Sequence, residues 1–162
     1  MVGSLGKKLN LIRELALKDL KIRYSRPALG FLWAFLSPFL MVAIFYLIFG
    51  IILKVQTENV PFVLYLMSGI FPWLFFQESI TRSITSLMDN KNLIREARFP
   101  HYLLPVSMTL AVFINFLPSL FILIAYSLFI LRGASGLIGL LPFIVVAHFL
   151  ITVGLSVIVS IL

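Results

Sequence analysis

The feature that most constrains this chain is the length of its runs without a charged residue. Four such runs cover residues 27–53, 59–77, 99–131 and 133–162. A bilayer core about 30 Å thick is crossed by roughly 20 helical residues, so each run can hold one span. Backbone groups have no partners in lipid, and the runs lack the period-2 alternation of a membrane barrel. The pattern therefore predicts transmembrane helices.

The composition excludes several classes of protein. Of the 162 residues, 61% are hydrophobic and 12% are charged, whereas a soluble domain has about 25% charged residues. A soluble globule of this composition would expose large apolar patches. The sequence contains no cysteine, which rules out disulfides, thiolate metal sites and cysteine nucleophiles in this chain. We interpret the chain as an all-α integral membrane protein, and not as a soluble enzyme, a nucleic-acid module or a disordered chain.

We expect one transmembrane domain over residues 1–162, with an interfacial helix followed by four spans. The spans are expected near residues 29–53, 60–83, 103–131 and 137–162. Residues 1–26 form a basic segment in which 8–24 reads as a helix on the membrane surface. Its apolar face is predicted to carry Leu9, Ile12, Ala16 and Leu20, with a second stripe of Leu11, Leu15 and Ile22. The alternative is a positively charged topogenic tail.

The distribution of basic residues predicts the orientation. All but two of the 13 lysines and arginines lie in residues 1–26 or 82–98, and the exceptions are Lys54 and Arg132. The positive-inside rule then predicts a multi-pass protein with a cytoplasmic N-terminus. The net charge of +7 is accounted for by this topology and by anionic lipid, so no nucleic-acid partner is expected.

Residues that could carry chemistry are sparse. The string Gly3-Ser4-Leu5-Gly6-Lys7-Lys8 has two residues between its glycines, where a phosphate-binding loop has four. His101 and His148 share no turn-spaced carboxylate, so no zinc site is indicated. We expect His148 to make an interhelical hydrogen bond rather than to relay protons. No acidic residue falls in the core of a span, and we expect neither catalytic residues, nor a metal, nor a cofactor bound by this chain.

Two further features remain open on the residues alone. Residues 88–100 form the one internal loop large enough to dock a partner, and a solvated connector is the alternative. Aromatic residues are abundant, with 16 Phe, 5 Tyr and 2 Trp. They form interfacial belts and packing contacts, or they line a path for sugars. The candidates for such a path are Trp33, Phe35, Phe39 and Trp73.

Three strings, in this order and spacing, resemble polysaccharide-exporting ABC-2 type permeases. The first, residues 21–38, reads KIRYSRPALGFLWAFLSP, and the second, residues 65–76, reads YLMSGIFPWLFF. The third contains Asn92-Leu93-Ile94-Arg95, followed by Phe99-Pro100 and Leu104-Pro105. O-antigen permeases and teichoic-acid permeases fit these motifs equally well.

This resemblance implies a homodimeric permease of the bacterial cytoplasmic membrane, working with two copies of a separate ATPase subunit. ATP and Mg would bind to that partner, and the permease itself would not be an enzyme. The substrate would be a lipid-linked polysaccharide such as O-antigen, with teichoic acid or capsule as alternatives. The resemblance also implies that residues 88–100 dock on the ATPase. The docking residues would be Asp89, Lys91, Asn92, Leu93, Ile94, Arg95, Glu96, Arg98 and Phe99.

The resemblance further implies that the N-terminal helix lies near the entry site of the lipid-pyrophosphate headgroup. By their charge and depth, Arg23 and Arg26 are expected to contact this anion, together with Tyr24 of the same string. Permeases of this family have six spans, so we expect this sequence to be the N-terminal part of a longer protein. Two functions from other classes stay open. One is a membrane enzyme of lipid-linked sugar metabolism, and the other is a non-catalytic scaffold or channel.

Overall fold

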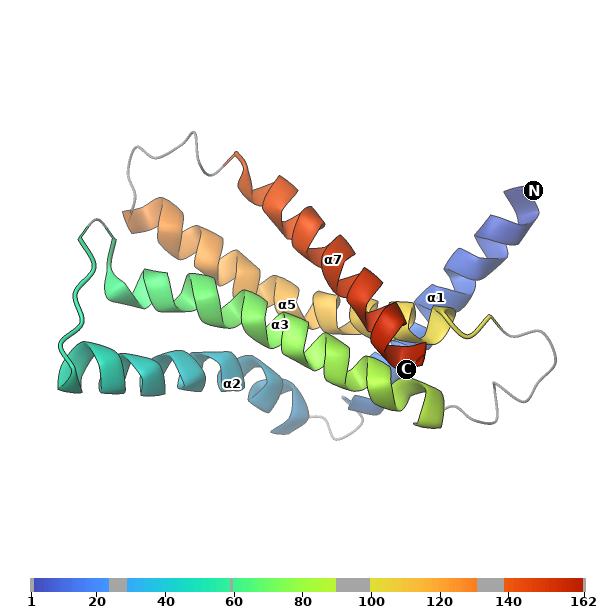
Figure 1. Ribbon diagram of the computed structural model, residues 1–162, viewed down its shortest axis with the longest axis horizontal. Coiled ribbons are helices and arrows are strands. Elements are labelled where there is room, and N and C mark those ends of the chain that lie inside the picture. Colours follow the sequence, from blue (N-terminus) through green and yellow to red (C-terminus); the bar gives the residue numbers. More distant parts are fainter. Residues whose placement is uncertain (1, 24–28, 59, 90–99, 131–138, 162) are drawn as a thin grey trace.

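The computed structural model describes residues 2–23, 29–58, 60–89, 100–130 and 139–161, and the statements below concern these residues (Figure 1). Every regular element among them is a helix. The elements are α1 (Val2–Arg23), α2 (Leu29–Phe45), the π-helix η1 (Tyr46–Ile52), α3 (Phe62–Asp89), α5 (Leu103–Ile130) and α7 (Leu141–Ile161). The predicted all-α class is therefore confirmed for the part of the chain that the structure describes.

Three helices are long and apolar enough to cross a membrane: Phe62–Ser86 within α3, Leu103–Ile130 and Leu141–Ile161. A shorter apolar helix covers Leu36–Ile52, where α2 passes into η1. The expectation that this first run forms a fourth span stays a prediction. The helix bounds differ most from the predicted spans in α3, which continues to Asp89 instead of ending at residue 83. Hydropathy falls there, but no proline or glycine interrupts residues 84–89, so the helix persists.

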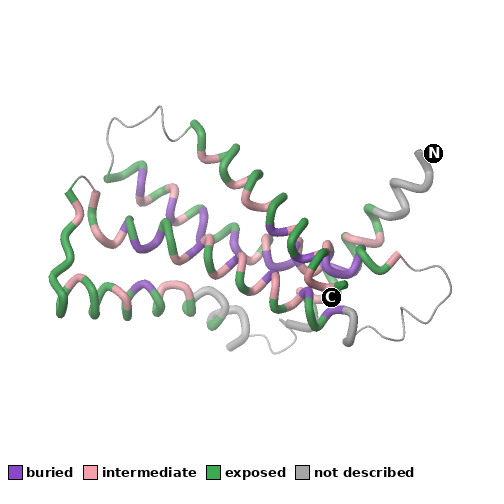
Figure 2. The backbone as a smooth tube through the Cα atoms, viewed as in Figure 1, coloured by how far each residue is buried: buried purple, intermediate pink, exposed green. Residues whose placement is uncertain are grey.

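Helix α3 lies at the centre of the bundle, with α5 and α7 on one side and α2 on the other (Figure 1). Its buried apolar residues form one cluster with α5 and with Val42 of α2. The cluster consists of Val42, Leu64, Leu66, Met67, Phe71, Phe75, Val112, Phe116, Leu120 and Leu123. Figure 2 shows buried positions concentrated along α3 and α5, whereas α2 and α7 are mostly exposed.

Helix α7 turns its few polar side chains inward. Thr152 and Ser156 are fully buried, while Phe143, Leu150 and Ile158 are largely exposed. In water the opposite pattern would hold, but in lipid apolar side chains need no cover and polar groups seek partners on other helices. This inverted burial fits a helix in a bilayer.

Helix α1 packs against α5, near the end of the bundle that holds the polar end of α3 and the C-terminal end of α7 (Figure 1). The helix extends from Val2, earlier than the predicted start at residue 8. Among its described side chains, Leu15 and Ala16 are buried, whereas Leu9, on the apolar face predicted to lie against the membrane, is 63% exposed. The buried pair takes one residue from each of the two predicted apolar stripes.

Candidate transport site at the polar end of α3

The candidate site lies where α3 changes from apolar to polar. Its 28 residues correspond to about 42 Å at 1.5 Å per residue, which exceeds a bilayer core of about 30 Å. The helix starts with apolar residues at Phe62, and its first charged residue is Glu78. If Phe62 lies near one membrane boundary, Glu78 lies about 24 Å further along the helix, just inside the other boundary, and Arg82 lies about 30 Å along, at that boundary. The site is therefore placed at a membrane–water boundary.

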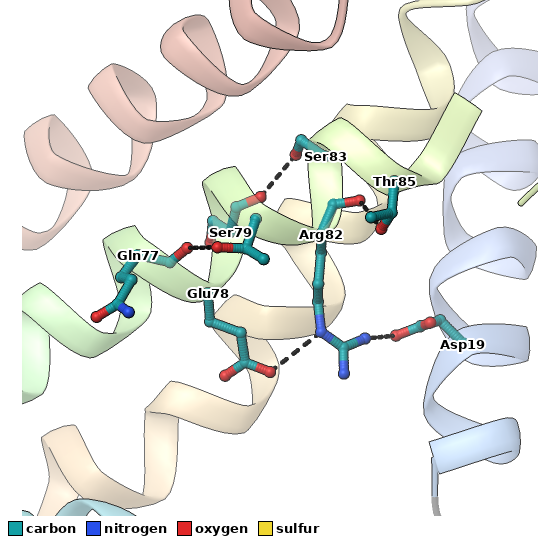
Figure 3. A network of polar contacts seen from close by, with 8 residues as sticks. Asp19, Gln77, Glu78, Ser79, Arg82, Ser83 and Thr85 are labelled. Carbon is teal, nitrogen blue, oxygen red and sulfur yellow. Dashed lines mark hydrogen bonds and ion pairs between the residues drawn. The ribbon is translucent and has the colours of Figure 1, made fainter. Parts of the chain in front are cut away.

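An arginine at this boundary joins two carboxylates from different helices. Arg82 Nη1 donates to Asp19 Oδ2 of α1 at 2.8 Å, and Arg82 Nε donates to Glu78 Oε1 at 3.1 Å (Figure 3). The side chains are 27% exposed for Arg82, 19% for Asp19 and 37% for Glu78. Partial burial shields these pairs from salt more than fully exposed pairs. The network, with one cation and two anions, carries a formal charge of −1 and links α1 to α3.

A groove of about 480 Å³ runs beside this network, between α2 and α3. Its wall on α2 is formed by Trp33, Ser37 and Pro38, and the α3 wall is formed by Leu74, Gln77, Glu78, Thr81 and Arg82. Positions 74, 77, 78, 81 and 82 recur at helical spacing, so they share one face. Figure 3 shows the side chains of Gln77, Glu78 and Arg82 pointing to the same side of α3, with Ser83 on the opposite side. The groove therefore combines an indole, a carboxylate, an amide and hydroxyl groups.

A smaller cavity of about 50 Å³ adjoins the groove on its inner side. Pro38, Leu74 and Glu78 line both spaces, and α5 adds Asn115 and Ser119 to the inner one. About 10–15 Å³ is enough for one water molecule when polar partners are present. Glu78 thus stands between an open polar groove and a small polar cavity within the bundle.

The face of α3 opposite the groove is held by buried hydroxyl groups. Ser79, Ser83 and Ser86 are buried at spacings of four and three, and Ser83 Oγ donates to the Ser79 carbonyl oxygen at 2.7 Å. Between α5 and α7, Thr109 Oγ1 donates to Ser156 Oγ at 3.1 Å, and both residues are fully buried. Small polar residues allow close approach of helices in a membrane. They fix the scaffold on which the groove is built.

The interhelical hydrogen bond expected for His148 is present. Its Nε2 lies 3.3 Å from the carbonyl oxygen of Pro72 in α3. Because that carbonyl can only accept, Nε2 carries the proton. The ring also meets Phe75 edge-on, with centroids 5.5 Å apart. His148 thus joins α7 to α3 at a proline.

The predicted aromatic residues separate into different environments. Trp33 is 62% exposed and lines the groove. Phe39 packs edge-on against Phe71, with centroids 5.4 Å apart, and so belongs to the packed interior. Trp73 is 60% exposed and tilts against Phe76, outside the groove lining. Phe35 lies in α2, but its side chain is outside the described part. The structure does not bring the three described side chains, Trp33, Phe39 and Trp73, together in one site.

Most of the predicted docking and headgroup residues lie outside the described residues. This applies to Tyr24 and Arg26, and to the docking residues Lys91, Asn92, Leu93, Ile94, Arg95, Glu96, Arg98 and Phe99. Arg23 and Asp89 are described only as the last residues of α1 and α3. Their roles stay predictions.

Sequence reasoning missed the network and the groove. Glu78 and Arg82 stand four apart, a spacing typical of helical ion pairs, so this contact carried a local signal. Asp19 is 63 positions from Arg82, and no local pattern relates two residues so far apart. The groove likewise depends on how α2 lies against α3.

Comparison with known proteins adds a further finding. Residues 10–162 match the ABC-2 type transporter family. An O-antigen export system permease protein RfbA of Klebsiella pneumoniae is 33% identical over 162 residues, covering 99% of this chain and 61% of that protein. The protein of the same name from Myxococcus xanthus is 28% identical over 160 residues, with the same coverage of each chain.

A second kind of relative matches over a shorter stretch. A polysialic acid transport protein KpsM of Escherichia coli is 29% identical over 82 residues, covering 51% of this chain and 32% of that protein. The chain therefore spans about 61% of the length of the curated O-antigen relatives that it matches.

Proposed function

Because the chain belongs to the ABC-2 type transporter family, we propose that it forms part of the membrane-spanning permease of an ATP-driven polysaccharide exporter. The observation that carries this proposal is its similarity, over 99% of its length, to O-antigen export permeases of two distant bacteria. Apolar helices long enough to cross a membrane support a multi-pass location, for which we propose the bacterial inner membrane.

The proposed substrate is a polysaccharide carried on a lipid, of the O-antigen type. A capsular polysaccharide is the alternative, since the polysialic acid transport relatives match half of the chain. A teichoic acid is the third candidate, because the sequence motifs do not separate it from O-antigen. The lipid-pyrophosphate headgroup would meet Arg23, Tyr24 and Arg26, where cationic donors suit an anion.

The proposed partner is a separate ATPase subunit, present in two copies beside a homodimer of this permease, and it would bind ATP and Mg. We propose residues 89–99 as the segment that docks on this partner. This segment begins at Asp89, the last residue of α3, which is a single helix that passes the groove and the buried core. A push on the docking segment would reach the groove through that helix.

The proposed orientation places the N-terminus in the cytoplasm. Asp19 of α1 contacts Arg82 near the polar end of α3, so the two most basic stretches of the sequence meet at one end of the bundle. This arrangement agrees with the positive-inside rule, which assigns that end to the cytoplasm. The ATPase would then have access to both α1 and the docking segment.

Charge reversal in the docking segment tests this proposal. We expect the Arg95→Glu and Glu96→Lys double variant to reach the membrane at normal levels and to abolish polysaccharide export in cells. A control variant, Glu58→Lys, changes charge in the loop after η1 and should export normally. Export that survives disruption of residues 91–98 would contradict the docking assignment.

Two other functions are separated from this one by simple assays. A membrane enzyme would transfer sugars without any ATPase, and a channel would pass glycan into liposomes without nucleotide. We expect neither activity from the purified permease.

A further inference from the structure

We propose that the groove between α2 and α3 is a binding site for an uncharged sugar unit of the transported glycan, with Trp33 as its stacking surface. This inference rests on the proposed function, since it names where the permease would hold its substrate. The groove volume of about 480 Å³ falls within the roughly 300–1,000 Å³ of typical small-molecule sites.

The aromatic wall suits the apolar face of a sugar ring. Trp33 is 62% exposed although it carries the largest apolar side chain of the groove. An indole presents a flat face with negative electrostatic potential, against which the C–H groups of a pyranose pack well. Trp73 is equally exposed, at 60%, but does not line the groove. Trp33 therefore differs from Trp73 in its position beside the groove and not in its exposed fraction.

The opposite wall suits hydroxyl groups. Gln77 offers an amide that both donates and accepts, Glu78 offers a carboxylate that accepts, and Thr81 offers a hydroxyl that does both. Sugar hydroxyls are themselves donors and acceptors, so neighbouring hydroxyls can bond to neighbouring groups of this wall. A few polar groups beside an aromatic surface are typical of sites that orient a small polar ligand.

The wall is held in place before a ligand arrives. Arg82 binds Glu78 at 3.1 Å, and Asp19 binds Arg82 at 2.8 Å from the far side. The carboxylate is therefore oriented by an arginine that is itself fixed to another helix. A group that is already oriented loses less entropy on binding a ligand.

The charge balance argues against an anionic ligand. Arg82 is matched against two carboxylates, so a phosphate placed in the groove would meet a net negative network. The lipid-pyrophosphate end of the substrate is thus disfavoured at this site.

Paired variants make the inference testable in the full-length permease in nanodiscs. The probe is the neutral polysaccharide released by mild acid from its lipid carrier in the host strain. We expect Trp33→Ala to weaken its binding about tenfold, the equivalent of about 1.4 kcal/mol, with Trp73→Ala close to wild type. A second pair compares two exposed threonines of α3, which both donate to backbone carbonyls, at 2.9 Å for Thr81 and 3.2 Å for Thr85. Thr81→Ala should weaken binding, and Thr85→Ala should not.

Several results would overturn the inference. These are the absence of glycan binding to the wild type, equal losses in Trp33→Ala and Trp73→Ala, and competition by inorganic pyrophosphate. Loss of binding only when phosphatidylethanolamine is present would instead make the groove a lipid site and would also overturn it. The proposed function fails separately, if the wild-type permease with its ATPase does not export glycan. Normal export with a Trp33→Ala variant that binds glycan normally would refute the site alone.

Discussion

The ion pair between Arg82 and Asp19 is predicted to hold α1 against the bundle. The perturbation is a double-mutant cycle with Asp19→Asn and Arg82→Gln, which remove the charges; Asn keeps the shape of Asp19, and Gln keeps the apolar stem of Arg82 while shortening it. Exposed ion pairs contribute about 0.2–1 kcal/mol, whereas breaking a buried pair costs about 3–5 kcal/mol. With side chains 27% and 19% exposed and a contact of 2.8 Å, we expect a coupling energy between these limits, of about 1–2 kcal/mol.

Hydrogen exchange of the full-length permease in nanodiscs provides the assay, because it measures the opening of individual helices. Asp19→Asn should lower the protection of α1 amides about tenfold, which corresponds to about 1.4 kcal/mol, and should leave α5 protected. Glu78→Gln is the matched control, since Arg82–Glu78 is an i,i+4 pair within one helix. This control should leave α1 protection near that of the wild type.

Two results would refute the reasoning about this pair. One is additive effects of the two substitutions, since groups that interact must show coupling in a double-mutant cycle. The other is an equal loss of protection in α1 and α5, which would mean that the variants destabilise the whole bundle. In either case, the contact between α1 and α3 would contribute nothing specific to the position of α1.

Three further predictions concern the packing of the helices. His148→Phe keeps an aromatic ring but removes the Nε2 donor to the Pro72 carbonyl oxygen. It should lower the free energy of unfolding in bicelles by about 0.6 kcal/mol. An unchanged free energy of unfolding would mean that this hydrogen bond is not formed. Thr109→Val should lower the free energy of unfolding by a similar amount in the same assay, because the hydrogen bond to Ser156 is lost. In a Ser156→Ala background, Thr109→Val should cause no further loss of stability. Gly50→Ala places a methyl group 3.1 Å from the Tyr46 ring and 3.2 Å from the Phe62 ring, so both rings must move by a few tenths of an ångström. We expect this to cancel the gain of about 1 kcal/mol from replacing a helical glycine, and a clear rise in thermal stability would contradict this.

The positions of most helices could be predicted because they depend on the local sequence. Charge-free runs mark where helices can lie in lipid, and the helix over Leu103–Ile130 agrees with the predicted 103–131 within one residue. The polar side of α1 can also be read from the sequence, because Asn10, Glu14, Lys18 and Lys21 recur at helical spacing, and all four are exposed. The interhelical hydrogen bond of His148 could be predicted too, because a lone polar side chain in an apolar helix must find a partner.

The contacts between helices could not be predicted, because they depend on the rotation and depth of each helix. Hydropathy gives α1 two apolar stripes, but it does not show that Leu15 and Ala16 become buried while Leu9 stays 63% exposed. The groove has the same origin. Nothing in the sequence around Trp33 in α2 shows that this residue will line one groove with Gln77 and Thr81 of α3.

The most direct test of the proposed function is ATP-dependent transport by the reconstituted exporter. The full-length permease and its ATPase would be placed in proteoliposomes with fluorescent lipid-linked glycan in the outer leaflet, in the orientation that exposes the ATPase outside. Glycan should become protected inside the vesicles with ATP and Mg, and not with a non-hydrolysable analogue or without the ATPase. Protection that is independent of nucleotide, or its absence with ATP despite an active ATPase, would contradict the assignment of this chain to an ATP-driven polysaccharide exporter.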